Sequence, residues 1–86
     1  MNAINPMTDT ARMHTYAAAA RYARAVWEKI NALRMKDVTN KKLEAVFWDA
    51  TELVAMSRSR KFRRNPVETC NLVDEVAIAA AEAAAL

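Results

Sequence analysis

Between Asn40 and Arg64, hydrophobic positions repeat with the period of an α-helix on two opposite sides of the chain. One side is a core-type stripe made of Leu43, Val46, Phe47, Ala50, Leu53, Val54 and Ser57. The nearly opposite side carries Trp48, Ala55 and Phe62 at heptad spacing, with Ala45 and Met56 beside them. A helix that is apolar on two sides must cover both, either between two other helices or against a second copy of the chain. This stretch, 40–64, is therefore predicted to be the central helix.

The stretch before it predicts an amphipathic helix over residues 9–35, with start signals at 8–10 and a flexible arm over 1–8. Its apolar stripe consists of Tyr16, Ala19, Ala20, Ala23, Val26, Trp27, Ile30 and Leu33. The segment 36–40 interrupts the apolar phase and ends in Asn40, a residue that favours the N-cap position. Because this connection is short, the first two helices are expected to be antiparallel neighbours.

A third helix is predicted over 66–85. Asn65 is a capping residue, Pro66 suits the first helical position, and Glu68 stands three residues after the cap, as in a capping box. The apolar face consists of Leu72, Val73, Val76, Ala77, Ala80, Ala83 and Ala84. This stretch contains acidic residues and no basic one, which allows it to dock against the more basic helices before it.

The patterns together predict an all-α fold: a small three-helix bundle of long antiparallel helices that forms a single domain over 1–86. Glycine is absent from the 86 residues, so tight turns and glycine-rich phosphate loops are not expected. Alanine favours helix but buries little area, so a lone copy with Trp48 and Phe62 exposed is expected to be marginally stable. Self-association as a homo-oligomer is therefore predicted, through Trp48, Ala55 and Met56.

Three features of the sequence indicate the cellular compartment of the protein. The single cysteine, Cys70, does not allow an internal disulfide, and the N-terminus lacks the pattern of a secretory signal. No apolar run reaches the roughly 20 residues that a membrane-spanning helix needs. A cytoplasmic protein without a membrane partner is expected.

Catalytic chemistry is not favoured by the residues available. His14 and Cys70 are far apart in sequence and too few for a zinc site, and no cofactor-binding motif is present. Ser57 and Ser59 have no base nearby in sequence, and Asp49 and Glu52 have a spacing common on solvated helix faces. We expect no catalytic residue, no metal and no cofactor, and predict that the chain is not an enzyme.

The strongest chemical signal is the segment 57–65, SRSRKFRRN. It contains Arg58, Arg60, Lys61, Arg63 and Arg64 around the aromatic Phe62. Cations near a helix C-terminus are favoured by the helix dipole, but one or two suffice for that purpose. Arginine is suited to bidentate contacts with phosphate or carboxylate groups. These six residues are therefore predicted to bind a partner.

Two classes of function follow. The first is a protein-binding module: a small inhibitor or adaptor, of the kind that phages and mobile elements encode against host defences such as CRISPR. It would engage an acidic or nucleic-acid-binding surface of a larger protein or nucleoprotein complex. The alternative is a helical dimer that binds nucleic acid directly, with Phe62 as a stacking residue. A structural subunit of a helical assembly is a further alternative. A helix-turn-helix is not favoured, because the helical phase continues from Leu43 to about Lys61.

Overall fold

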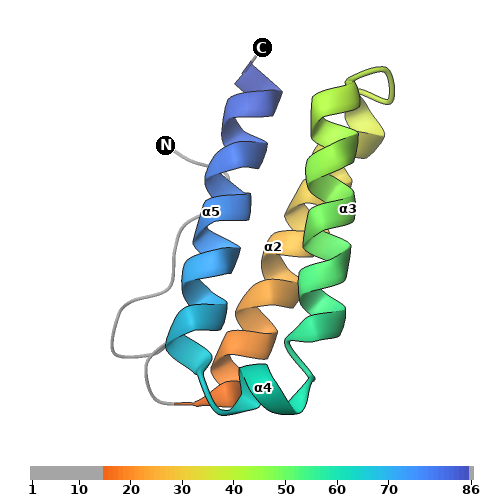
Figure 1. Ribbon diagram of the computed structural model, residues 1–86. Coiled ribbons are helices and arrows are strands. Elements are labelled where there is room, and N and C mark those ends of the chain that lie inside the picture. The colour runs from red at the N-terminus through yellow and green to blue at the C-terminus, as the bar shows by residue number, and fades with distance from the viewer. Residues whose placement is uncertain (1–14, 86) are drawn as a thin grey trace.

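The computed structural model describes residues 15–85, which form four helices and no strand. The helices are α2 (Tyr16–Lys36), α3 (Lys41–Met56), α4 (Arg60–Arg63) and α5 (Pro66–Ala85). The predicted all-α class is confirmed. Each long helix packs against the other two, and Figure 1 shows α2 and α5 running upward and α3 running downward. The short α4 lies across the lower end (Figure 1).

The helix expected over 9–35 does not run unbroken through Thr15. Thr15 has an extended backbone, with φ −144° and ψ 144°, and its hydroxyl accepts a hydrogen bond from the Ala18 amide at 2.9 Å. Thr15 is therefore the N-cap, and the expected continuous helix over 9–35 is wrong at this point. The expected arm over 1–8 and the start signals at 8–10 lie outside the described residues.

The other two long helices begin where their capping residues indicate. The side-chain oxygen of Asn40 accepts a hydrogen bond from the Leu43 amide at 3.0 Å. At the start of α5, the side-chain amide of Asn65 donates to a Glu68 carboxylate oxygen at 2.8 Å. The Glu68 backbone amide lies 3.4 Å from the Asn65 side-chain oxygen, which completes a reciprocal cap. With Pro66 as its first residue, α5 spans the range expected from this motif.

The expected single helix over 40–64 is wrong, because it breaks after α3. The Ser57 hydroxyl donates to the Val54 carbonyl at 2.8 Å, a local bond by which serine competes with helix continuation. The backbone amides of Arg58 and Ser59 donate to carbonyls only three residues back. Ser59 then becomes extended, with ψ 156°. The helical phase from Leu43 to Lys61 is thus interrupted, and α4 leaves in a new direction.

This break changes the environment of Phe62. In an unbroken helix Phe62 would share a face with Trp48, two heptads earlier. After the break Phe62 is only 6 % exposed, whereas Trp48 is 58 % exposed. Burying a phenylalanine side chain contributes about 1.5–3 kcal/mol, and the amides of Arg58 and Ser59 keep backbone bonds, to the Ala55 and Met56 carbonyls. Burial of Phe62 therefore favours the break.

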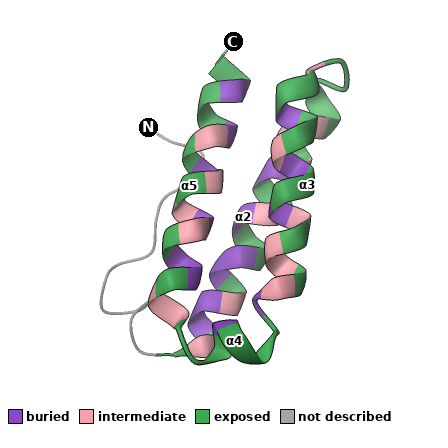
Figure 2. Cartoon of the chain, in the orientation of Figure 1, coloured by how far each residue is buried: buried purple, intermediate pink, exposed green. Residues whose placement is uncertain are grey.

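The core lies between the three long helices, on the sides that face one another (Figure 2). Its fully buried large side chains are Ile30, Leu43 and Val73, one from each helix. Tyr22, Val26 and Phe47 are also buried in it, and alanines such as Ala23 on α2 lie between these larger side chains and permit close helix approach. The core consequently mixes large and small side chains in similar numbers.

Two hydrogen bonds between pairs of side chains join helices across this core. The Trp27 indole N–H on α2 donates to the Thr51 hydroxyl on α3 at 2.8 Å. The Tyr22 hydroxyl on α2 donates to the Asp74 carboxylate on α5. Both bonds fix the rotation of α2 relative to a neighbour, which apolar contact alone specifies less well.

Candidate functional site

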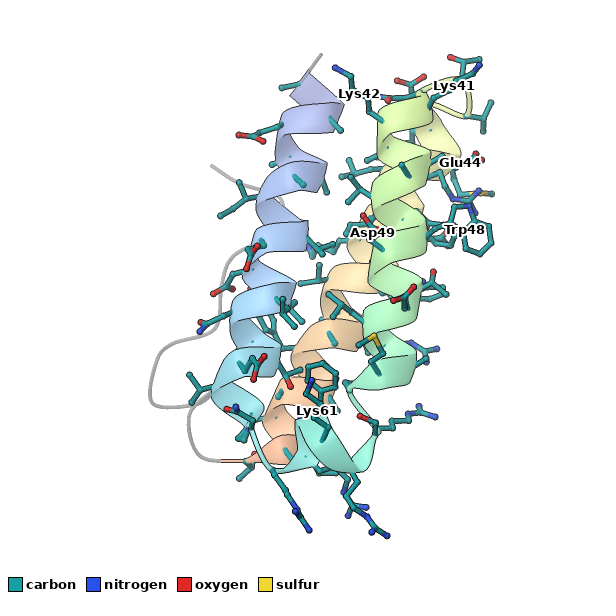
Figure 3. The ribbon with its side chains drawn as sticks, in the orientation of Figure 1. Lys41, Lys42, Glu44, Trp48, Asp49 and Lys61 are labelled. Atoms are coloured by element: carbon teal, nitrogen blue, oxygen red, sulfur yellow. The ribbon has the colours of Figure 1, made fainter. Side chains whose placement is uncertain are left out.

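The basic end of the molecule consists of five cations in and around α4: Arg58, Arg60, Lys61, Arg63 and Arg64. All five side chains are exposed. Because α4 crosses the lower end of the three long helices, these cations gather there, and Figure 3 labels Lys61 among them. Lys41 and Lys42 lie at the opposite end of α3 (Figure 3). The five cations around α4 therefore form one group at the lower end, separate from Lys41 and Lys42.

Helix capping does not account for the basic end. The last turn of α3 contains no basic residue, and α4 is a four-residue helix with little dipole of its own. The N-termini of α2 and α5 also lie at this end and carry partial positive charge (Figure 1). Within residues 15–85, no ion pair within 4.0 Å involves any of the five cations. Their positive charge is therefore uncompensated by the described part of the chain.

The structure corrects the expected role of Phe62. A side chain that is 6 % exposed has no free ring face for stacking on a partner. Phe62 instead anchors α4, which packs against α5, and the Lys61 ammonium lies 5.9 Å from its ring centroid. The guanidinium of Arg63 lies 4.8 Å from the ring centroid of Tyr16, at the start of α2. These contacts attach the basic end to both neighbouring helices.

The expected self-association face is divided by the structure. Trp48 and Ala55 are exposed on α3, while Phe62 has left that face for the interior. Met56 is partly buried and lines the groove toward α5. Trp48 packs edge-on against the buried Phe47, with ring centroids 5.1 Å apart. The largest apolar residue left exposed on the expected face is Trp48.

Sequence reasoning missed a groove between the lower halves of α3 and α5. It has a volume of about 270 Å³ and is called here the acidic groove. Its lining residues are Asp49, Glu52, Leu53, Met56, Leu72, Glu75 and Val76. Three are carboxylates and four are apolar. Figure 3 shows Asp49 on the side of α3 that faces α5. The available sequence signal is the acidic character of the third helix, but the spacing of Asp49 and Glu52 on α3 is equally typical of a solvated helix face.

Arg34, a cation outside the basic end, is held against the ring of Phe47. The guanidinium of Arg34 on α2 lies 4.0 Å from the ring centroid of Phe47 and donates to the Asn31 side chain at 3.1 Å. Its Nε atom is buried without a hydrogen-bond partner among the described residues. Arg34 thus belongs to the contact between α2 and α3 rather than to a free basic surface.

The described residues contain no group of three or more His, Cys, Asp and Glu side chains that could hold a metal ion. Ser57 and Cys70 are buried, and Ser57 is bonded to its own helix. His14 lies outside the described residues. No helix within residues 15–85 is long and apolar enough to cross a bilayer. Comparisons with protein-family models, curated proteins and solved structures found no match to this chain.

Proposed function

We propose that the chain is a non-enzymatic protein-binding module, an inhibitor or adaptor that engages an acidic or nucleic-acid-binding surface of a larger partner through its basic end. The observation that carries this proposal is the group of five exposed cations without an ion pair to any described residue. Like charges gathered at one end repel one another and lower the stability of a small fold. Binding to a negatively charged partner surface would offset that repulsion and explain why the cations are there.

The attachment of α4 supports a binding role for the basic end. Phe62 and the Arg63–Tyr16 contact hold the backbone that carries the cations. A surface that is already ordered loses less conformational entropy on binding than a loose tail does. Four of the five cations are arginine, whose planar guanidinium matches carboxylate and phosphate groups in a bidentate geometry. The basic end therefore combines an ordered backbone with guanidinium groups that can form bidentate contacts.

The second candidate is direct binding to nucleic acid. The exposed arginines favour it, because they suit phosphate contacts. Burial of Phe62 removes the stacking contact that the sequence suggested, so the remaining contacts are chiefly electrostatic. Affinity of that kind should fall steeply with salt concentration as counterions are released.

The finer architecture and the assembly belong to the same proposal. We infer a bundle of three long antiparallel helices, with α4 as the element that presents the basic end. Trp48 and Ala55 form a second exposed surface, which suits contact with another chain in a larger helical assembly. In this account the two surfaces are separate, because Trp48 lies on the body of α3 and the cations lie beyond its end.

The proposal is tested by affinity capture from a lysate of the source cells, with and without nuclease. Two variants with the same net charge are compared with the wild type. The basic-end variant replaces Arg58, Arg60, Arg63 and Arg64 by glutamate. The control variant replaces Arg21, Lys29, Lys41 and Lys42, which are exposed cations on other parts of α2 and α3, by glutamate.

A defined protein retained by the wild type and the control but not by the basic-end variant, with nuclease present, supports the protein-binding proposal. Retention that disappears with nuclease supports the nucleic-acid alternative. Equal retention by the basic-end variant and the wild type contradicts both, because the cations would then be only a solvated end of the fold.

A further inference from the structure

The acidic groove has the chemistry of a site for a cationic, partly apolar occupant. Its floor includes Leu53 and Val76, and its rim carries Asp49, Glu52 and Glu75. These three carboxylates are exposed and form no ion pair within 4.0 Å with another residue of the described range. Arginine side chains fit such a groove well, because their aliphatic stems cover apolar surface while their guanidinium groups reach carboxylates.

A second hollow between the same helices shows that this charge pattern is specific to the lower half. The upper hollow is lined by Lys42, Val46, Ala79, Glu82 and Ala83, so it carries one charge of each sign. It has no net preference for a cation. The acidic groove, in contrast, carries three negative charges and no positive one.

The cations that fit the groove lie on the same chain, directly beyond its lower end. Met56 is both the last residue of α3 and part of the groove lining, and α4 follows after the three residues 57–59. Figure 3 shows Lys61 on α4 below Asp49, on the same side of the molecule. One continuous surface therefore carries an acidic groove beside a basic end, yet the two form no ion pair with each other.

We propose that this surface binds a second copy of the chain, with the basic end of each copy seated in the acidic groove of the other. A surface with adjacent patches of opposite charge is self-complementary under a two-fold axis, because each patch then meets its opposite on the partner copy. Two grooves and two basic ends are used at once. The surface area of the groove alone is small compared with the roughly 800 Å² that each partner buries in a standard interface. The neighbouring basic end is therefore a necessary part of the contact.

This dimer differs from one built on Trp48, which lies outside the acidic groove. The inference does not rest on the proposed function, but the two share the basic end. Where both hold, a larger acidic partner and a second copy compete for the same cations. The dimer would then be a form in which the basic end is occupied until the partner displaces the second copy.

The test is a charge-exchange experiment followed by sedimentation velocity at low salt over a dilution series. The basic-end variant carries Arg58→Glu, Arg60→Glu, Arg63→Glu and Arg64→Glu. The groove variant carries Asp49→Lys, Glu52→Lys and Glu75→Lys. Its control carries Glu28→Lys, Glu44→Lys and Glu82→Lys, three exposed carboxylates outside the groove.

The wild type and the control should sediment with twice the 9.6 kDa mass of one copy. Each of the two interface variants alone should be monomeric, because its groove and its basic end then carry the same sign. An equimolar mixture of these two variants should form a heterodimer, because the acidic ends face basic grooves and the basic ends face acidic grooves. This restoration also demonstrates that both variants are folded.

Three results would overturn the proposal. The first is a wild type that stays monomeric at every concentration. The second is a groove variant that dimerises as well as the control does. The third concerns a mixture that remains monomeric. That result overturns the proposal if a milder groove variant, with Asp49→Asn, Glu52→Gln and Glu75→Gln, is folded by circular dichroism and dimerises as strongly as the wild type.

Discussion

The side-chain amide of Asn40 donates a hydrogen bond to the backbone carbonyl of Ala83, 3.0 Å away and 43 residues later in the chain. The same side chain accepts the Leu43 amide as the N-cap of α3. Carbonyls in the last turn of a helix have no partner within that helix. Asn40 therefore starts α3 and at the same time holds the end of α5 against the connection between α2 and α3.

Asn40→Ala should lower the free energy of unfolding by about 1–3 kcal/mol, because it removes a cap worth about 1 kcal/mol and a hydrogen bond worth about 0.5–1.5 kcal/mol. Asn40→Asp should cost less, since aspartate keeps the cap and loses only the bond to the Ala83 carbonyl. Urea unfolding of the wild type and the two variants gives the order of their free energies of unfolding. If Asn40→Asp is as stable as the wild type, the contact with Ala83 contributes nothing, and if the two variants are equally stable, the cap contributes nothing.

Truncation should cost much more stability at Phe62 than at Trp48. Phe62→Ala removes a buried ring and should destabilise the protein by about 3–5 kcal/mol. Trp48→Ala removes a side chain that is 58 % exposed, so its cost should be clearly smaller. Chemical denaturation followed by circular dichroism measures both. A larger loss for Trp48→Ala would show that α3 continues through residue 62 and that Phe62 is on the surface.

Thr51→Val should destabilise the protein although valine has nearly the same shape as threonine. The substitution leaves the Trp27 indole N–H, which now donates to the Thr51 hydroxyl, without a partner, at a cost of about 1–3 kcal/mol. Thr39→Val, at an exposed position in the connection, is the matched control and should change stability little. A double-mutant cycle with Trp27→Phe should yield a coupling energy. A coupling of zero would mean that the bond is unimportant.

Attachment of α4 also has a functional consequence. Phe62→Leu keeps every cation and much of the apolar volume, but it should hold α4 less firmly. Under the proposed function, the affinity for the partner should fall while the net charge stays constant. Isothermal titration at a temperature where both proteins are folded measures this effect. Unchanged affinity would indicate that the cations act without a fixed α4.

Local chemistry explains the parts of the fold that could be predicted. The start of α5 follows from Asn65, Pro66 and Glu68, whose side chains act within a few residues of one another. The start of α3 follows from Asn40 in the same way. The all-α class follows from the periodic apolar stripes and the absence of glycine.

The break between α3 and α4 could not be predicted from periodicity, because no glycine or proline marks it. It depends on burial of Phe62, which only the arrangement of the other helices provides. Ser57 and Ser59 were the available signal, since serine bonds locally to the backbone and favours helix ends. For the same reason the acidic groove was missed: Glu52 on α3 and Glu75 on α5 meet only through the packing of two helices.

The most direct test of the proposed binding role is the dissociation constant for the protein that the wild type captures, measured at one salt concentration for three proteins. The control with Arg21, Lys29, Lys41 and Lys42 replaced by glutamate should remain close to the wild type. The variant with Arg58, Arg60, Arg63 and Arg64 replaced by glutamate should lose more than tenfold, that is more than about 1.4 kcal/mol. An equal loss in both variants would show that net charge alone is responsible, and no loss in either would remove the basic end from the binding site.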